Sequence, residues 1–445
     1  MKKMSNGLLK IVKWFVKKLP NSLITKIMKQ EYRQRVVDKL LKRKLQAMGA
    51  VLIEGPKLCG KSTTAVQQAE SVLNMEPGPT LSLAAINPKL LLQGTTPRLI
   101  DEWQLAPQLW DVIHREIDLR GGEPGQFILT GSAVPVDSRQ LKHSGTGRFS
   151  WLRMRPMTLF ESGESNGTVS LKDLFEGQLN IGSNNVLDLE RIAFAACRGG
   201  WPTTLRLKGE LALTHAFEYV EALIKRDISR ADGVRRNQDV TRKLLRSYAR
   251  YQGLQVSAPE LAKDLNGIVN DKTVLSYLNA LKEIFVIEDL PAWNPNLRSK
   301  AAIRQSDTRY FVDPSIAVAA LSAGPKDLLF DTKTFGFIFE TLCIRDLRVY
   351  AEALDGSLFH FRDRNGLECD AVLYRRNGTY GLIEIKLGSE KGIEDGVDTL
   401  KTLASKIDTT KMQPPSFLMV LIASGEYAYR REDGVLVVPI GCLKD

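Results

Sequence analysis

A nine-residue stretch near the start of the chain constrains the fold more than any other feature. It follows the pattern G-x-x-x-x-G-K-S and consists of Gly55-Pro56-Lys57-Leu58-Cys59-Gly60-Lys61-Ser62-Thr63. The apolar run 50–53 precedes it like a buried strand, and residues 62–70 follow it like the opening of a helix. This context predicts a phosphate-binding loop (P-loop), because glycines let backbone N–H groups wrap an anion at the positive end of the helix.

Two side chains of this loop have the chemistry to complete a nucleotide site. Lys61 is expected to reach the β- and γ-phosphates of ATP, and the hydroxyl of Ser62 is expected to ligate Mg²⁺. The alternative is an ordinary glycine-containing turn between a strand and a helix. The correct flanks on both sides favour the phosphate-binding loop, with ATP and Mg²⁺ as its ligands.

A second motif is an apolar strand that ends in two carboxylates, Arg98-Leu99-Ile100-Asp101-Glu102. Asp101 is expected to hold Mg²⁺, and Glu102 is expected to polarise the water that attacks the γ-phosphate. An acidic loop after a strand is the alternative. The P-loop upstream favours the catalytic interpretation.

A further apolar strand, 127–131, ends in hydroxyl side chains. We expect it to lie between the strand of the P-loop and the strand of the acidic pair, where Thr130 or Ser132 would sense the γ-phosphate. Arg148 follows in the glycine-containing segment 145–148. It would supply charge to the transition state in cis or from a neighbouring subunit, and an ordinary surface arginine is an equal alternative.

The positive charge of the chain is concentrated at its N-terminus. The 445 residues carry a formal net charge of +11, but residues 1–50 alone hold 14 Lys and Arg against 2 Asp and Glu. The remaining residues therefore form a nearly neutral body. Residues 7–19 predict a basic amphipathic helix, which could lie on a membrane surface or on a partner. Packing on its own protein is the interpretation we favour.

The composition argues against several classes of protein. The five cysteines are scattered without a C-x-x-C pair, and the four histidines form no H-E-x-x-H motif. These patterns argue against a disulfide framework, a zinc site and a zinc hydrolase. No apolar run approaches the roughly 20 residues of a membrane span. A cytoplasmic protein is expected.

Residues 50–200 alternate apolar strands with helical stretches, which predicts a parallel α/β sheet. The candidate strands are 50–54, 80–84, 98–101 and 127–131.

Residues 205–290 are mostly helical in pattern. Two helices, 261–265 and 273–282, precede a candidate strand at 285–290, and this order predicts a winged-helix-like module. Residues 257–290 are acidic overall, whereas phosphate contacts need positive charge. We therefore favour a structural or protein-binding role for this module over DNA binding.

The C-terminal part carries a second group of charged residues. A hairpin is expected at the turn 363–366, which contains Asn-Gly, and Asp370 follows on its second strand. Glu384 and Lys386 project together from the next strand, because residues i and i+2 share a face. Glu340, on the preceding helix, is a third candidate acidic ligand.

This D…E-x-K pattern is a weak signature of restriction-endonuclease-like folds. Two carboxylates can hold Mg²⁺ while the lysine orients or deprotonates a water. A degenerate or purely structural version of the site is the alternative, and the sequence favours it slightly.

Together these motifs resemble a known family, the bacterial and archaeal P-loop ATPases of the AAA superfamily that carry the C-terminal domain of unknown function 4143. The match runs from about Tyr32 to the C-terminus. Besides the motifs above, it rests on residues 128–132, 145–148, 154–157, 198–202 and 311–315. Leu58 stands where relatives often have an aromatic residue, which should not disturb phosphate binding. The basic stretch before Tyr32 lies outside the match.

The resemblance implies an α/β multidomain protein: an AAA-type P-loop NTPase domain with a parallel sheet, a winged-helix-like middle and a PD-(D/E)xK-like α/β C-terminal domain. The expected segments are a basic extension, an ATPase domain, a middle domain and a nuclease-like domain, at 1–31, 32–203, 204–330 and 331–445.

The leading hypothesis is a Mg²⁺-dependent ATPase whose nucleotide state controls the C-terminal domain. One rival is an ATP-coupled nuclease that acts on DNA or RNA. The other is a nucleotide-gated protein-interaction module with little turnover. Nucleic acid, a protein partner and a second copy of the chain are therefore the macromolecular partners to consider.

Overall fold

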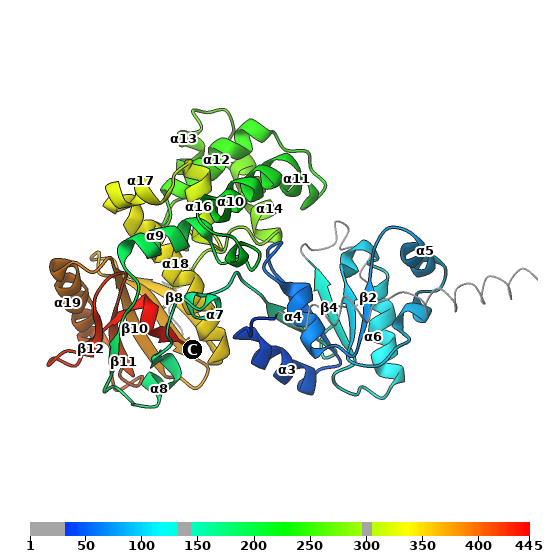
Figure 1. Ribbon diagram of the computed structural model, residues 1–445, viewed down its shortest axis with the longest axis horizontal. Helices are drawn as coiled ribbons and strands as arrows, with labels where there is room; N and C mark the ends of the chain where they lie inside the picture. Colours follow the sequence, from blue (N-terminus) through cyan, green and yellow to red (C-terminus); the bar gives the residue numbers. More distant parts are fainter. Residues whose placement is uncertain (1–31, 132–143, 296–304) are drawn as a thin grey trace, which may run out of the picture.

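The computed structural model describes residues 32–131, 144–295 and 305–445. The amphipathic helix expected over 7–19 and the candidate sensor Ser132 lie outside the described residues. Figure 1 shows a P-loop sheet on the right, a group of helices at the top and a second α/β body at the lower left.

Five parallel strands form the P-loop sheet, in the order β2-β3-β4-β1-β5. Their bounds are β1 Ala50–Glu54, β2 Ser71–Asn74, β3 Arg98–Asp101, β4 Phe127–Gly131 and β5 Phe149–Arg153. The strands predicted over 50–54, 98–101 and 127–131 are present. The predicted position of β4 between β1 and β3 is confirmed.

Helices cover both faces of this sheet, because side chains alternate along its buried strands. Val51 and Ile53 share a core with α3 and α4, whereas Ala50 and Leu52 share a core with α5 and α6. The helices are α3 Val37–Ala47, α4 Lys61–Gln68, α5 Pro79–Ile86 and α6 Leu109–Leu119, with short 3₁₀ turns η1 Pro88–Leu92 and η2 Trp103–Leu105.

The strand predicted over 80–84 is wrong. These residues belong to α5, which begins with Pro79 in its first turn, a position where proline is pre-organised for a helix. The short apolar run fits either a strand or a helix. The second strand of the sheet is β2, whose four residues are only partly buried.

After β5 the chain crosses to the C-terminal body. Two short strands of this crossing segment, β6 Val169–Ser170 and β7 Gly182–Asn184, pair with β14 and β12. The segment also contains α7 Leu159–Ser162 and α8 Leu171–Phe175. The predicted segment 32–203 is therefore not one packed body, because part of it completes a sheet made by residues far downstream.

The C-terminal body is a seven-stranded mixed sheet in the order β7-β12-β13-β11-β10-β9-β8. Ala371 and Ile383 face the long helix α18, and Val372 and Leu382 face α19. The remaining bounds are α18 Thr332–Ala353, β8 Gly356–Arg362, β9 Glu368–Arg375, β10 Tyr380–Lys386, α19 Glu390–Lys406, β11 Phe417–Ile422, β12 Tyr427–Arg430, β13 Leu436–Pro439, η6 Ile440–Cys442 and β14 Leu443–Lys444. The predicted hairpin at 363–366 joins β8 to β9.

The middle segment is a group of helices at the top of Figure 1. Its elements are α9 Leu189–Arg198, η4 Thr204–Arg206, α10 Glu210–Ala222, the π-helical turn η5 Leu223–Asp227, α11 Ile228–Arg230, α12 Gln238–Arg250, α13 Ala258–Asp264, α14 Asp271–Glu283, α16 Pro314–Leu321 and α17 Pro325–Phe330. The strand predicted over 285–290 is reduced to two isolated bridges, Ile287 to Phe311 and Leu290 to Thr308. The winged-helix-like character of this segment stays a prediction.

Candidate functional site

The P-loop joins the end of β1 to the start of α4. Gly55 and Gly60 have φ angles of +152° and +101°, a region that favours glycine. A Cβ on Gly55 would lie 2.0 Å from the carbonyl oxygen of Met154, so no larger residue fits. Leu58 lies between the two glycines with φ of +64° and is 54% exposed. The loop thus returns to the N-terminus of α4, where an anion is stabilised.

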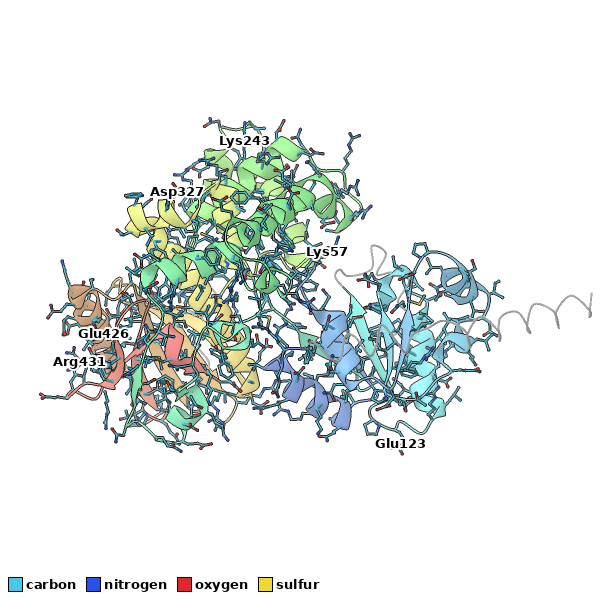
Figure 2. All side chains as sticks on the ribbon, viewed as in Figure 1. Lys57, Glu123, Lys243, Asp327, Glu426 and Arg431 are labelled. Carbon is cyan, nitrogen blue, oxygen red and sulfur yellow. The ribbon has the colours of Figure 1, made fainter. Side chains whose placement is uncertain are left out.

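Lys61 is buried at the start of α4. Its Nζ donates hydrogen bonds to the carbonyl oxygens of Gly55 at 2.9 Å and Pro56 at 2.8 Å. The ammonium group therefore lies over the first half of the loop. Lys57, which Figure 2 labels at the boundary with the middle segment, donates instead to Asp227 Oδ1 at 2.6 Å.

Three oxygen-bearing side chains meet beside Lys61 at the carboxyl edge of the sheet. Ser62 Oγ donates to Asp101 Oδ1 at 2.8 Å, and Thr130 Oγ1 donates to the same carboxylate oxygen. The structure thus brings Ser62, Asp101 and Thr130 together, because parallel strands end at one edge. Hydroxyl and carboxylate oxygens form a donor set that suits Mg²⁺.

Glu102 follows Asp101 with a left-handed backbone, φ +56°. Its carboxylate accepts a hydrogen bond from Gln104 Nε2, and Gln104 Oε1 is buried without a hydrogen-bond partner among the described residues. The sequence analysis did not single out Gln104. Its proximity in sequence to the acidic pair was the available signal.

Arg148 lies at the other edge of the sheet. Its carbonyl accepts a hydrogen bond from the N–H of Ala50, the first residue of β1, whereas the P-loop follows the last residue of β1. Its guanidinium pairs with Asp118 at 2.8 Å. The predicted role of Arg148 in cis is therefore wrong. The glycine-containing segment precedes a parallel strand, and this places it opposite the phosphate loop.

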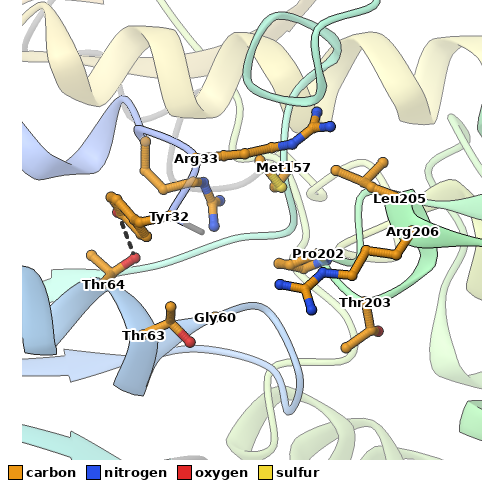
Figure 3. Close-up of a pocket in the computed structure, with 11 residues that line it drawn as sticks. Tyr32, Arg33, Gly60, Thr63, Thr64, Met157, Pro202, Thr203, Leu205 and Arg206 are labelled. Carbon is orange, nitrogen blue, oxygen red and sulfur yellow. Dashed lines mark hydrogen bonds between the residues drawn. The ribbon is translucent and has the colours of Figure 1, made fainter. Parts of the chain in front are cut away.

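A pocket of about 300 Å³ adjoins the P-loop on the side of Gly60, Thr63 and Thr64. Figure 3 shows it between α4 and the segment after α9. The Tyr32 hydroxyl lies 3.0 Å from Thr64 Oγ1 and donates to Asp38 at 2.6 Å. The other lining residues are Arg33, Arg35, Met157, Pro202, Thr203, Leu205 and Arg206.

This pocket combines an aromatic ring, apolar side chains and a few polar groups, as small-molecule sites do. The sequence analysis missed its residues as ligand-binding candidates. Met157 and Pro202 belong to the matched segments 154–157 and 198–202, so the sequence did point to these residues. That they line one pocket with Tyr32 depends on long-range folding.

A buried network of residues from far downstream binds Gly200 and Trp201, which directly precede the pocket-lining residue Pro202. Asp313 Oδ2 accepts hydrogen bonds from the N–H of Gly200 at 2.9 Å and from Arg345 Nη1 at 3.0 Å. Ser315 Oγ donates to Asp313 at 2.6 Å and accepts from Trp201 Nε1 at 3.0 Å. The network accounts for Asp313 and Ser315 of the matched segment 311–315, because their side chains bond to each other, to Gly200 and Trp201, and to Arg345 of α18.

The C-terminal charged residues also meet. Lys386 Nζ lies 2.6 Å from Glu384 Oε2 and 3.7 Å from Asp370 Oδ2. Asp370 Oδ2 accepts a hydrogen bond from the N–H of Ile385 at 2.7 Å. Among the described residues, no group of three or more His, Cys, Asp or Glu side chains has the arrangement of a metal site. The ammonium group of Lys386 thus pairs with both carboxylates.

Glu340 is the fourth predicted member of this group. It accepts a hydrogen bond from Tyr310, which the sequence analysis missed. Burial and the nearby Asp370 raise the pKa of Glu340 well above its usual value, and the same two causes raise the pKa of Glu384 to about 8. A cleft of about 270 Å³ adjoins Glu340 and Lys386.

Family models match three parts of the chain. An AAA domain matches residues 48–162, a domain of unknown function (DUF8612) matches residues 189–327, and another (DUF4143) matches residues 335–443. No curated protein sequence matches the chain significantly. In the described residues, no helix has the length and apolar character needed to cross a membrane.

Several solved structures are similar at low identity. The Walker-type ATPase PABY2304 of Pyrococcus abyssi is 14% identical with a TM-score of 0.39, covering 65% of this chain and 96% of that chain. The RuvB Holliday-junction branch-migration motor of Thermotoga maritima is 18% identical with a TM-score of 0.23, covering 57% and 89%. AMPPCP-bound DnaA from Aquifex aeolicus is 13% identical with a TM-score of 0.27, covering 55% and 86%.

None of these three TM-scores reaches 0.5, so the assignment of the domains depends on the family models. The AAA model covers the P-loop and the Asp101–Glu102 pair, and the DUF4143 model covers Asp370, Glu384 and Lys386. The chain therefore contains an AAA domain over residues 48–162 and a domain of unknown function (DUF4143) over residues 335–443.

Proposed function

We propose that this protein binds MgATP at the P-loop and hydrolyses it. The observation that carries the proposal is the meeting of Ser62, Asp101 and Thr130 beside the buried ammonium group of Lys61. In this assignment Lys61 binds the β- and γ-phosphates, Ser62 and Asp101 hold Mg²⁺, and Thr130 contacts the γ-phosphate. Mg²⁺ would neutralise charge that develops on the phosphate oxygens.

Glu102 is the proposed base that orients the attacking water. Its hydrogen bond to Gln104 directs the carboxylate along the edge of the sheet. We propose that Gln104 holds Glu102 in this position and releases it when a γ-phosphate and its water are present.

The pocket beside Gly60, Thr63 and Thr64 is the proposed site of the nucleotide base and ribose. It adjoins the P-loop, and Tyr32, Met157 and Pro202 offer apolar surface of the kind that planar bases contact. Arg206 lines the same pocket and adds positive charge to it.

Phosphate release tests this proposal. The wild-type chain is expected to release phosphate from ATP only when Mg²⁺ is present. Lys61→Ala is expected to lower the rate by about two orders of magnitude, because it removes a charge that contacts the transferring group. Equal rates in wild type and variant would contradict the assignment and favour the interaction module with little turnover.

We further propose that the nucleotide state is transmitted to the C-terminal domain. Support comes from the Asp313 network, which joins Gly200 and Trp201, the two residues before the pocket-lining Pro202, to Arg345 of α18. The same helix carries Glu340, whose partner Tyr310 lies three residues before Asp313. A shift of the segment at Gly200 would therefore reach the C-terminal charged group through two contacts with α18, one at Arg345 and one at Glu340.

An ATP-coupled nuclease is the second candidate function. The observation in its favour is the contact between Asp370, Glu384 and Lys386 on neighbouring strands, next to the 270 Å³ cleft. The ion pairing of Lys386 with both carboxylates favours a structural role instead.

Plasmid DNA and a single-stranded RNA, incubated with Mg²⁺ and ATP, separate the two roles of this group. A nuclease predicts cleavage by wild type that Lys386→Ala and Glu384→Gln both abolish. Cleavage that survives both substitutions would indicate another site or a contaminant.

A neighbouring subunit that presents Arg148 in trans remains a further proposal, tested by mixing Lys61→Ala chains with Arg148→Ala chains and looking for restored turnover.

A further inference from the structure

Arg35 lies against the P-loop and is nearly inaccessible, with 5% of its surface exposed. Its Nη1 donates a hydrogen bond to the carbonyl oxygen of Cys59 at 2.9 Å, and its Nη2 donates to the carbonyl oxygen of Arg155 at 2.8 Å. One guanidinium group thus joins the P-loop to the segment that follows β5. No motif of the sequence singles out this arginine.

The charge of Arg35 is neutralised by the adjacent carboxylate of Glu161. Its Nε lies 3.0 Å from Oε1 of Glu161, a carboxylate that also accepts hydrogen bonds from the N–H groups of Val36 and Thr158. Burial acts to lower the pKa of Arg35, but Glu161 raises it above its usual value. Because its charge is compensated by a carboxylate, Arg35 would attract a phosphate only weakly. Its effect on phosphate binding would come mainly from the backbone groups that it positions.

What Arg35 holds is the peptide between Cys59 and Gly60. This bond is trans in the structure, and a trans peptide is planar with its C=O and N–H on opposite sides. Because Arg35 binds the Cys59 carbonyl, the N–H of Gly60 points away from the guanidinium. Gly60 also has φ of +101°, so its backbone could otherwise adopt either orientation of this peptide.

We propose that Arg35 is a positioning residue for nucleotide binding: it fixes the Cys59–Gly60 peptide so that the Gly60 N–H faces the phosphates. A flipped peptide would present a carbonyl oxygen to an anion in place of a donor, which is repulsive. This inference rests on the proposed binding of ATP at the P-loop. It assigns to Arg35 a function in phosphate affinity in addition to its place in the lining of the pocket.

The experiment measures the affinity of the full-length chain for ADP and for adenosine, by calorimetry and by competition. Arg35→Met is expected to weaken ADP binding about tenfold to a hundredfold, as for loss of one hydrogen bond to a charged group. Adenosine binding should fall much less than ADP binding, since adenosine has no phosphate for the Gly60 N–H to meet and Arg35 is only one of the residues that line the pocket. Arg35→Lys, which keeps the charge but has a single donor group, should fall between Arg35→Met and wild type.

Arg236→Met is the matched control. Arg236 is also buried, donates to a backbone carbonyl, that of Ile228, and pairs with a carboxylate, that of Asp232. It contacts no P-loop atom in these hydrogen bonds, so its loss should affect stability and leave ADP affinity unchanged. If Arg35→Met does not fold, the double variant with Glu161→Gln removes both charges of the pair and keeps the test available.

The outcomes separate the two proposals. A wild-type chain that does not bind ADP overturns the proposed function, and the role of Arg35 with it. A wild type that binds ADP while Arg35→Met binds it equally well overturns only the role of Arg35. Equal losses of ADP and adenosine affinity also overturn it, because Arg35 would then act on the base pocket directly.

Discussion

At the scale of single residues, the carboxylates of the P-loop site and those of the C-terminal charged group differ in their hydrogen-bonding and ion-pair partners. Ser62 and Thr130 converge on one oxygen of Asp101, so a bound cation would replace contacts between neutral hydroxyls and a carboxylate. Lys386 instead lies between two carboxylates on adjacent strands. The first group is therefore ready to bind a cation, whereas the second is already neutralised by its own lysine.

The pH dependence of stability provides a prediction about Glu384. Burial and Asp370 raise the pKa of this carboxyl from 4.5 to about 8. Between these values the folded state binds more protons than the unfolded state, so the free energy of unfolding falls as pH rises. The slope is at most about 1.4 kcal/mol per pH unit for one proton. Glu384→Gln should remove this slope.

Urea unfolding of wild type and Glu384→Gln at several pH values between 5 and 9 checks the prediction. The variant should gain stability relative to wild type as pH rises through this window. Glu368→Gln is a suitable control, since Glu368 is exposed on the neighbouring strand β9 and pairs with Arg362. Parallel pH profiles for wild type and Glu384→Gln would show that Glu384 is ionised throughout.

The residues of the first site could be predicted from sequence because they lie in short contiguous motifs. Gly55 to Thr63 and the Asp101–Glu102 pair each follow a strand that its apolar residues identify. Tyr310 and Asp313 could not be predicted in the same way, because their partners Glu340 and Gly200 are brought close only by folding. The position of Arg148 could not be predicted because β5, the strand that begins at the next residue, is not among the strands that the sequence predicts. A residue that precedes a strand parallel to β1 lies at the amino edge of the sheet, opposite the P-loop.

At the scale of elements, the segment that leads into the pocket beside the P-loop is attached to α16 and α18 through Gly200 and Trp201. Asp313 lies 113 residues after Gly200, yet it accepts the Gly200 N–H in a fully buried position. The guanidinium of Arg345 binds both Asp313 and Asp346, and Asp346 in turn accepts the N–H of Leu159. Buried networks of this kind are costly to disrupt.

Asp313→Asn tests this attachment. The amide group would place a donor against the Gly200 N–H or against Arg345, and breaking a buried ion pair typically costs about 3–5 kcal/mol. We expect a loss of this size in the free energy of unfolding, together with weaker ADP binding, because the segment that leads into the pocket is held by the same carboxylate. Urea denaturation and calorimetry measure the two effects.

Asp188→Asn is the control for that substitution. Asp188 caps α9 by accepting the N–H of Arg191 at an exposed position, and asparagine caps helices equally well. Its effect should stay within about 0.5 kcal/mol, as for surface substitutions. An Asp313→Asn chain as stable as Asp188→Asn, with wild-type ADP affinity, would contradict the proposed attachment.

Element types were predictable where periodicity and capping agreed. The helices around 261–265 and 273–282 have capping residues Ser257 and Asn270 and were located correctly. The run 80–84 was assigned to a strand because five apolar or small residues fit both periods, and the proline that begins α5 lies outside them. Over 285–290 only Ile287 and Leu290 form bridges, and Phe285 belongs to the turn after α14 with φ of +59°, a conformation that a sequence pattern does not reveal.

At the scale of the whole molecule, the AAA-type domain and the C-terminal domain are joined by more than a linker. β6 and β7 come from the segment after the P-loop sheet and pair with strands near the C-terminus. Helix α3 contacts both the P-loop sheet and α18. These contacts mean that the domains defined by sequence matching are not independent packing units.

A truncated chain tests this interdependence. Residues 32–330 retain the P-loop and the middle segment but lack the partners of β6 and β7 and the helix α18 that contacts α3. Unpaired strands and an exposed apolar helix face promote aggregation. We expect the fragment to aggregate or to melt at a much lower temperature than the full-length chain, as measured by light scattering and circular dichroism. A monomeric fragment with the melting temperature of the full-length chain and full ADP affinity would contradict the account.

The central claim is that the residues at the carboxyl edge of the P-loop sheet hydrolyse ATP. The most direct test compares single-turnover phosphate release by wild type and Glu102→Gln under MgATP concentrations that saturate both. The account predicts that Glu102→Gln binds ATP as tightly as wild type, because Lys61, Ser62 and the loop are unchanged. Its phosphate release should be slower by about two to four orders of magnitude, the contribution typical of a general base. Phosphate release by Glu102→Gln at the wild-type rate, with ATP bound equally, would contradict it.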